Sequence, residues 1–413
     1  MNIKHRLTIL HFLQFFIWGA WLISAGGYMF VTLGFEGVQI GAVYAAMGIT
    51  SLFMPGLTGI IADRWVNAER VLGACHLIGA AALVGASMVT EYSIFYTLMF
   101  IHLMAFMPTI ALSNAVSYSL LEKAGLDVTE AFPPIRVWGT VGFILAMWSV
   151  DFMGWTKSPN QFLIAAGAAA LLGLYSFLLP QTKPVGVDAS KGWVTAMGLD
   201  AFVLFKEKRM AVFFIFSMLL GAALQITNAF GGPFLDSFST VYPDSFGVQH
   251  PNLLLSISQI SETLFILTIP FFLKRFGIKK IMVMSMLAWV ARFALFGIGD
   301  PAGGLVFLIL SMVVYGMAFD FFNISGSIFI EQEADPKMRA SAQGLFMIMT
   351  NGFGALIGGV ASGWVVDLYT TDGVSDWSTI WFVFAGYALL LAIVFPFVFH
   401  YKHKPEELAD VAH

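Results

Sequence analysis

Long apolar runs, separated by short polar breaks, follow one another along the whole chain. Each run is long enough to cross a bilayer as an α-helix, which takes about 20 residues, and none shows the alternation of a membrane β-strand. The pattern therefore predicts an all-α membrane protein with twelve transmembrane helices. Their expected bounds are 7–33, 39–62, 71–90, 93–121, 135–154, 161–180, 210–233, 252–273, 280–299, 303–330, 340–366 and 378–400.

The composition supports a chain embedded in a lipid bilayer. Hydrophobic residues make up 58% of the 413 positions and charged residues 11%, whereas soluble domains carry about 25% charged residues. This balance excludes a cytosolic enzyme, a secreted disulfide scaffold and a disordered regulator. The net charge of −4 provides no basic surface for nucleic acid. The histidines lack the spacing of zinc ligands and no phosphate-binding loop is present, so we expect no metal and no cofactor.

Positive charges are distributed unequally between the two sides of the predicted helices. Eighteen of the 21 Lys and Arg residues fall in the termini or in loops on the same side as the termini, and only Lys157 falls in a loop on the other side. Cytoplasmic loops of membrane proteins are enriched in Lys and Arg, so the distribution predicts that both termini are cytoplasmic. It also favours an even number of spans.

The longest polar interruption divides the chain into two halves of six predicted spans each. Weak matches between the halves recur in order, for instance GAWL at 19–22 and GAAL at 221–224. Parallel repeats of this kind are typical of transporters that bind their substrate between two bundles near mid-membrane. We expect an N-terminal six-helix bundle, a cytoplasmic linker, a C-terminal six-helix bundle and a cytoplasmic tail. Their expected bounds are 1–183, 184–209, 210–401 and 402–413.

One short motif resembles the signature of the major facilitator superfamily. The string GIIADR at 59–64 is similar to the superfamily motif between spans two and three, whereas the corresponding string after span eight, FLKRFGIKK at 272–280, lacks the acid. The resemblance implies the major facilitator fold, which has two six-helix bundles. It also implies an inner-gate role for Gly59, Asp63 and Arg64.

Six longer strings resemble the bacterial nucleoside:proton symporters of the same superfamily, and the likeness covers nearly the whole chain. They are FLQFFIWG at 12–19, FPPIRVWGT at 132–140, LQITN at 224–228, ISQISE at 257–262, FDFFNISG at 319–326 and RASAQG at 339–344. The resemblance implies a multi-pass protein of the bacterial inner membrane that takes up nucleosides together with protons. Such a protein is a transporter and not an enzyme.

Polar residues inside the predicted spans are candidates for the transport site, because a charge at mid-membrane costs at least about 2.5–3.5 kcal/mol. In span eight, Glu262 follows Gln259 by three residues, so the two share a helix face. In span seven, Gln225 and Asn228 are likewise three apart. Amides offer the paired donors and acceptors that bind a nucleobase or a ribose. Amides also join neighbouring helices in membranes, so this second interpretation stays open.

Span ten carries a second carboxylate, Asp320, close to aromatic side chains. Helical geometry places four residues within one arc of roughly 140°: Asp320, Asn323, Phe319 and Tyr315. Aromatic rings in such an arc can stack on a nucleobase, an interaction that contributes about 1–3 kcal/mol per base in nucleic-acid complexes. Each ring taken alone is also typical of ordinary helix packing.

Arg136, Thr140 and Phe143 form one stripe of span five, at i, i+4 and i+7. A stripe that faces the space between the bundles would let Arg136 bind a substrate hydroxyl or a carboxylate of the other bundle. The alternative is that its side chain snorkels to the cytoplasmic headgroups. By analogy with the superfamily, span nine lies on the outside of its bundle, which favours a structural or snorkelling role for Arg292.

These residues support a secondary transporter that imports nucleosides with protons by alternating access. A neutral nucleoside gains nothing from the membrane voltage, whereas a proton moving inward gains about 2.3 kcal/mol per 100 mV. We expect Asp320 to carry the proton, and Glu262 to contact the substrate and to titrate as well. A sugar:proton symporter of the same fold is the alternative, and an intramembrane enzyme that uses Asp320 and Glu262 is a further one. We expect a monomer.

Overall fold

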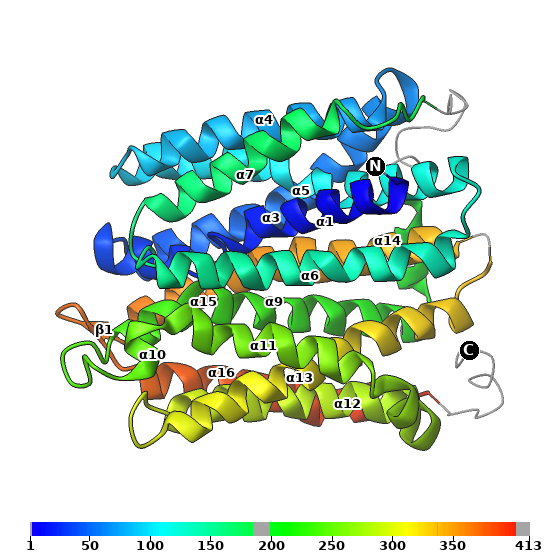
Figure 1. Ribbon diagram of the computed structural model, residues 1–413. Helices are drawn as coiled ribbons and strands as arrows, with labels where there is room; N and C mark the ends of the chain where they lie inside the picture. Colours follow the sequence, from blue (N-terminus) through cyan, green and yellow to red (C-terminus); the bar gives the residue numbers. More distant parts are fainter. Residues whose placement is uncertain (1, 185–198, 337, 402–413) are drawn as a thin grey trace. The chain divides into compact units, whose positions relative to one another are not determined.

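Two helical units make up the described part of the protein. A computed structural model describes residues 2–184, 199–336 and 338–401, and the units are Met1–Met197 (unit 1) and Gly198–His413 (unit 2). Within unit 1, α1 packs against α6, and α4 lies beside both α5 and α7 (Figure 1). The elements of unit 1 are α1 (Ile3–Gly19), α2 (Ala25–Gly27), the π-helical η1 (Tyr28–Thr32), α3 (Gly37–Arg64), α4 (Ala68–Ser87), α5 (Tyr92–Lys123), α6 (Val128–Phe152) and α7 (Asn160–Ser176).

Unit 2 is also built from packed helices, with one short hairpin. Within it, α12 packs against α13 and α16, while α9 lies along η3 and α15. Strands β1 and β2 pair antiparallel between α15 and α16. The elements are η2 (Leu199–Lys206), α9 (Lys208–Asp236), α10 (Phe246–Gln249), α11 (Pro251–Ile266), α12 (Ile269–Ile298), α13 (Leu305–Glu333), α14 (Arg339–Met347), the π-helical η3 (Ile348–Gly354), α15 (Ala355–Leu368), β1 (Thr370–Thr371), β2 (Val374–Ser375) and α16 (Trp377–Val398).

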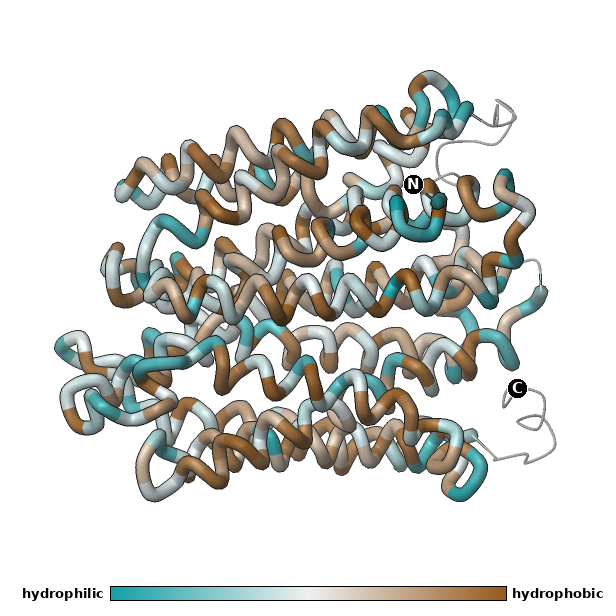
Figure 2. Tube along the Cα trace, in the orientation of Figure 1, coloured by the Kyte–Doolittle hydropathy of each residue, from teal (hydrophilic) through white to brown (hydrophobic). Residues whose placement is uncertain are grey.

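The helices confirm the predicted fold class. Nine helical segments of the described chain are long and apolar enough to cross a membrane, and α7 is a shorter apolar helix. Predicted spans one and eight are divided among shorter elements: span one comprises α1, α2 and η1, and span eight comprises α11 and the beginning of α12. Figure 2 shows apolar residues along the helices of each unit and hydrophilic residues mainly in the connections. This distribution suits helices whose backbone groups are satisfied internally in lipid.

The break between predicted spans eight and nine is shorter than expected and consists of a single residue, Gly277. The polar interval 274–279 predicts a connection between two helices, but helical backbone continues on both sides of Gly277. Gly277 has φ 74° and ψ 164°, a conformation that residues with a Cβ rarely adopt, so the chain turns there. Basic side chains at a membrane surface do not end a helix by themselves, which is why the polar interval overestimates the break.

Most of the expected linker 184–209 and the expected tail 402–413 lie outside the described residues. The described end of the linker forms η2, and α9 begins at Lys208. The division between units 1 and 2 falls inside this linker. The four expected domain bounds stay a prediction.

Close helix contacts in both units depend on glycine. In unit 1, a Cβ on Gly19 of α1 would lie 2.3 Å from the Phe143 carbonyl oxygen of α6. In unit 2, a Cβ on Gly221 of α9 would lie 2.1 Å from the Thr350 carbonyl oxygen of η3. No real Cβ approaches another atom so closely, so small residues permit the packing at both places. Gly19 and Gly221 are matched positions of the predicted repeat, and both allow a close approach of helices.

Candidate functional site

Three helices of unit 2 carry the predicted substrate and proton residues of the second half. Helix α11 packs against α13 and also contacts α9, so the three helices are neighbours. Gln225 and Asp320 are each 4% exposed and Tyr315 is 6% exposed, as expected for groups inside a bundle. The structure therefore brings this half of the predicted set into one region. Its members are Gln225 and Asn228 on α9, Gln259 and Glu262 on α11, and Tyr315, Phe319 and Asp320 on α13.

Aromatic rings and carboxyl groups meet in this region. The Tyr315 and Phe319 rings stack with centroids 5.8 Å apart and planes inclined by 6°. Trp289 of α12 contacts Tyr315 edge-on, with centroids 6.0 Å apart. Tyr315 interacts electrostatically with Glu262 and Asp320, and the two carboxyl groups interact with each other. The arc predicted on α13 therefore exists, and Glu262 of α11 adjoins it.

Three acceptor atoms in this region lack a donor from the protein. Gln225 Oε1, Gln259 Oε1 and Asp320 Oδ2 are buried, and no residue of the described chain donates a hydrogen bond to them. A buried acceptor without a donor costs about 1–3 kcal/mol, and such atoms are few in native proteins. The set is therefore suited to a molecule that brings its own N–H and O–H donors.

Of the two roles expected for Arg292, structural or snorkelling, the position of its side chain supports the structural one. Its side chain is only 3% exposed, and its guanidinium carbon lies 4.5 Å from the centroid of the Tyr315 ring. The side chain thus points into unit 2 and not toward lipid headgroups. Position along a span does not reveal which helix face is buried, and for this reason the sequence alone could not place it.

In unit 1, α6 places the stripe of Arg136, Thr140 and Phe143 beside α1. The Arg136 guanidinium carbon lies 4.0 Å from the centroid of the Phe15 ring, which is a cation–π contact. Phe143 is buried and its ring meets Trp18 edge-on, with centroids 6.4 Å apart. Arg136 and Thr140 are partly exposed. The Arg136 side chain therefore lies against the neighbouring helix α1.

The predicted set does not include a buried polar network in unit 1. Gln14 Nε2 of α1 donates to Thr109 Oγ1 of α5 (2.7 Å), and His76 Nε2 of α4 donates to Gln14 Oε1 (2.8 Å). His11 Nε2 of α1 lies 2.9 Å from Ser117 Oγ of α5. All five residues are buried, and together they join α1, α4 and α5. Their sequence signal is a polar residue in an apolar run, which structural and ligand-binding residues share.

The histidines of unit 1 do not form a metal site. No group of three or more His, Cys, Asp or Glu side chains that could hold a metal ion occurs within residues 2–184, 199–336 and 338–401. His11 and His76 are each bonded to a protein side chain through Nε2. Nδ1 of His102 lies 3.2 Å from the Gly79 carbonyl oxygen, to which it donates. These rings therefore serve packing and hydrogen bonding between helices.

The predicted gate motif lies at the end of α3. Asp63 is exposed and Arg64 is partly exposed, and open space surrounds the position where a Cβ on Gly59 would lie. The buried carboxylate of this region is Glu69, at the beginning of α4. Its Oε2 accepts hydrogen bonds from the backbone N–H of Thr182 (2.9 Å) and from the Thr182 hydroxyl. Glu69 therefore ties α4 to the chain that follows α7.

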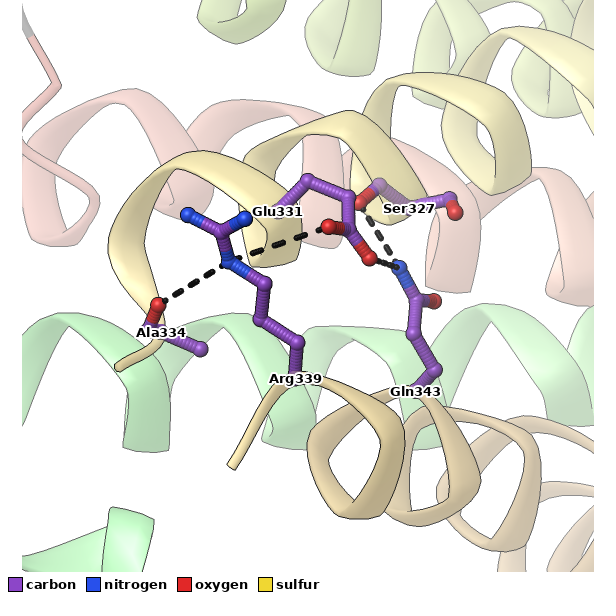
Figure 3. Close-up of polar contacts among 5 residues, drawn as sticks. All are labelled: Ser327, Glu331, Ala334, Arg339 and Gln343. Atoms are coloured by element: carbon purple, nitrogen blue, oxygen red, sulfur yellow. Dashed lines mark hydrogen bonds and ion pairs between the residues drawn. The ribbon is translucent and has the colours of Figure 1, made fainter. Parts of the chain in front are cut away.

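A polar cluster joins the end of α13 to α14 (Figure 3). Arg339 Nε lies 3.7 Å from Glu331 Oε2. Gln343 Nε2 donates to the Ser327 carbonyl oxygen (2.9 Å) and to Glu331 Oε1 (3.3 Å). Arg339 and Gln343 are the long polar side chains of the RASAQG string. This string therefore stabilises the turn between spans ten and eleven.

Nearly the whole chain matches known proteins. A family model described as nucleoside H+ symporter matches residues 1–404. The nucleoside permease NupG of Escherichia coli (strain K12) is 55% identical over 406 residues, which cover 98% of this chain and 97% of that protein. The xanthosine permease of the same strain is 56% identical over 411 residues, which cover 99% and 98%. A crystal structure of the nucleoside transporter NupG matches with a TM-score of 0.92 at 55% identity, over 97% of this chain and 100% of that chain.

Proposed function

The chain belongs to the nucleoside H+ symporter family, and on this premise we propose that it imports nucleosides across the bacterial inner membrane in symport with protons. It is a multi-pass membrane transporter and not an enzyme, since its relatives are permeases. Family membership favours a nucleoside:proton symporter over the two alternatives, a sugar:proton symporter and an intramembrane enzyme. The asymmetric distribution of Lys and Arg supports cytoplasmic termini. We also propose that the protein acts as a monomer.

The proposal that the substrate is a nucleoside rests on the buried acceptor atoms of unit 2 that receive no hydrogen bond from the described residues. A nucleoside brings ribose O–H groups and base N–H groups as donors, and Gln225 Oε1 and Gln259 Oε1 are buried acceptors without a donor from the described residues. Its planar base can stack on an aromatic ring, and Phe319 is partly exposed beside Tyr315. Asn228 and Glu262 are partly exposed on the same helices, and they add further polar contacts.

Residues of unit 1 are proposed to contact the nucleoside from the first half of the chain. Arg136, Thr140 and Phe143 share one stripe of α6, and Arg136 and Thr140 are partly exposed. The guanidinium offers several donors to ribose or base oxygens, and the Thr140 hydroxyl both donates and accepts. The motif of Gly59, Asp63 and Arg64 is proposed to act at the inner gate.

Proton coupling is assigned to the carboxyl pair of unit 2. Asp320 is 4% exposed and interacts electrostatically with Glu262. Two neighbouring carboxylates repel each other, so binding of a proton from the acidic outer side relieves that repulsion. Release of the proton to the cytoplasm then links inward movement of the nucleoside to the proton gradient. Asp320 is the proposed carrier because its Oδ2 has no donor among the described residues.

Uptake into proteoliposomes tests the proposal. The purified protein is reconstituted with a pH gradient, acidic outside, and uptake of radiolabelled uridine is followed with and without a protonophore. We expect accumulation that the protonophore abolishes and that unlabelled nucleosides, but not sugars, inhibit. Accumulation that a sugar inhibits and other nucleosides do not, or accumulation that does not depend on the pH gradient, would contradict the proposal.

A further inference from the structure

Arg292 of α12 is hydrogen-bonded to three other helices. Nη1 donates to the Ser311 carbonyl oxygen of α13 (2.9 Å) and lies 3.3 Å from Ser258 Oγ of α11. Nη2 lies 3.4 Å from Thr227 Oγ1 of α9. The Ser311 hydroxyl in turn donates to the Arg292 carbonyl oxygen (2.9 Å). One guanidinium therefore contacts each of the three helices that carry the predicted substrate residues of unit 2.

Each of these helices is held next to a residue of the proposed site. Thr227 immediately precedes Asn228 on α9, and Ser258 immediately precedes Gln259 on α11. On α13 the guanidinium touches a site residue itself, because its carbon lies 4.5 Å from the centroid of the Tyr315 ring. The contacts are thus concentrated at the level of the site, and they are not spread along the bundle.

The chemistry of arginine fits a positioning role better than a packing role. An uncharged side chain of similar volume would fill the same space without the cost of removing a charge from water. A charge in a membrane span also carries a cost of insertion into lipid. In return, the planar guanidinium supplies five donors in fixed directions, which the ammonium group of lysine does not. Several fixed donors are what is needed to hold three helices at once.

We propose that Arg292 is a positioning residue of the nucleoside site. It holds α9, α11 and the Tyr315 ring so that their polar and aromatic groups face one ligand. Because the Tyr315 ring stacks on Phe319, the same contact also orients that second ring. The inference rests on the proposed function and extends the site to a residue that need not touch the nucleoside.

Calorimetry with uridine, alongside thermal unfolding of the same purified protein, tests this role. Arg292→Lys keeps the charge but loses the fixed donors, and we expect it to fold and to bind uridine at least about tenfold more weakly. Thr227→Val and Ser258→Ala each remove one acceptor, and we expect about two- to fivefold weaker binding with little change in melting temperature. Combining Thr227→Val with Arg292→Lys should add nothing, because both changes remove the same contact.

Ser217→Ala is the control variant for the test of Arg292. Ser217→Ala removes a buried hydroxyl of α9 that donates within its own helix, to the Phe213 carbonyl oxygen (2.8 Å), and it should leave uridine affinity unchanged. A purely structural role predicts a lower melting temperature with wild-type affinity in the folded protein. That result for Arg292→Lys, or for both partner variants when Arg292→Lys does not fold, overturns the inference. Absence of nucleoside binding by the wild type contradicts the proposed function instead, so the two failures are distinguishable.

Discussion

Glutamine lies inside membrane spans of both units, but its surroundings differ between them. In unit 1 both ends of the Gln14 amide are occupied, since its Nε2 donates to Thr109 and its Oε1 accepts from His76. In unit 2 the Oε1 atoms of Gln225 and Gln259 are buried and receive no hydrogen bond from any described residue. The first amide joins helices, whereas the other two have acceptors that we propose a ligand occupies. On this proposal, hydrogen-bond satisfaction, and not residue type, separates the two roles.

The helix frame itself is similar in the two units. Gly19 of unit 1 and Gly221 of unit 2 both lie against a carbonyl oxygen of a neighbouring helix. Asp127 of unit 1 and Asp376 of unit 2 both cap a helix with the side chain. The two units therefore have similar helix contacts and helix caps, and they differ in the hydrogen bonding of their buried polar side chains.

Asp320→Asn should give the largest effect, which is complete loss of concentrative uptake. Asparagine resembles the protonated carboxyl in shape and neutrality, but it cannot release a proton. The variant should still bind uridine and exchange labelled for unlabelled uridine across a proteoliposome membrane. Protonophore-sensitive accumulation by Asp320→Asn would show that coupling belongs to another residue, and Glu262→Gln would then be tested in the same assay.

Substitution of the packing glycines should reduce stability in both units alike. An added methyl group in Gly19→Ala or Gly221→Ala would lie 2.3 Å or 2.1 Å from a backbone carbonyl oxygen, so the helices must move apart. Overpacking of this kind costs about 1–3 kcal/mol in free energy of unfolding. Gly167→Ala in α7 and Gly386→Ala in α16 meet open space and serve as controls. Equal melting temperatures for the four variants would show that the close contacts are not needed.

Gln14→Ala should destabilise unit 1 without changing the substrate affinity of the folded protein. The substitution leaves His76 Nε2 without its acceptor and Thr109 Oγ1 without its donor, and such loss costs about 1–3 kcal/mol. Thermal unfolding of the purified variant measures the loss. Gln225→Ala is the matched change in unit 2 and should unfold close to the wild-type temperature, because its Oε1 serves no described protein donor. A wild-type melting temperature for Gln14→Ala would contradict the structural role assigned to Gln14 in unit 1.

The helix caps should give the smallest effect, equal in the two units. The Thr129 hydroxyl and then its backbone N–H hold the pKa of Asp127 below its ordinary value of 3.8, and Thr379 does the same to the pKa of Asp376. A lowered pKa stabilises the fold above pH 3.8, and this stabilisation is lost as the pH falls through the lowered value. Melting temperatures of wild type and of Asp127→Asn or Asp376→Asn should therefore converge below pH 3.8. A constant difference down to low pH would contradict the cap assignment.

Hydropathy sufficed to predict the fold class, because a chain in lipid must satisfy its backbone internally and so forms helices of bilayer length. It also located the residues on α9, α11 and α13 that the structure brings together. The side-chain partners could not be predicted, since Gln14 and Gln225 look alike within apolar runs and differ only in what neighbouring helices offer them. The partners of Arg292 could not be predicted for the same reason, because they come from three other helices.

Calorimetric titration of uridine into the amide variants tests the central claim most directly. We expect Gln225→Ala, Asn228→Ala and Gln259→Ala each to bind uridine about three- to tenfold more weakly, the effect of losing one neutral hydrogen bond. Gln14→Ala, measured on its folded fraction, should bind with wild-type affinity. Wild-type affinity in all three unit 2 variants, or a loss in Gln14→Ala as large as theirs, would contradict the assignment of the nucleoside site to the unpartnered acceptors of unit 2.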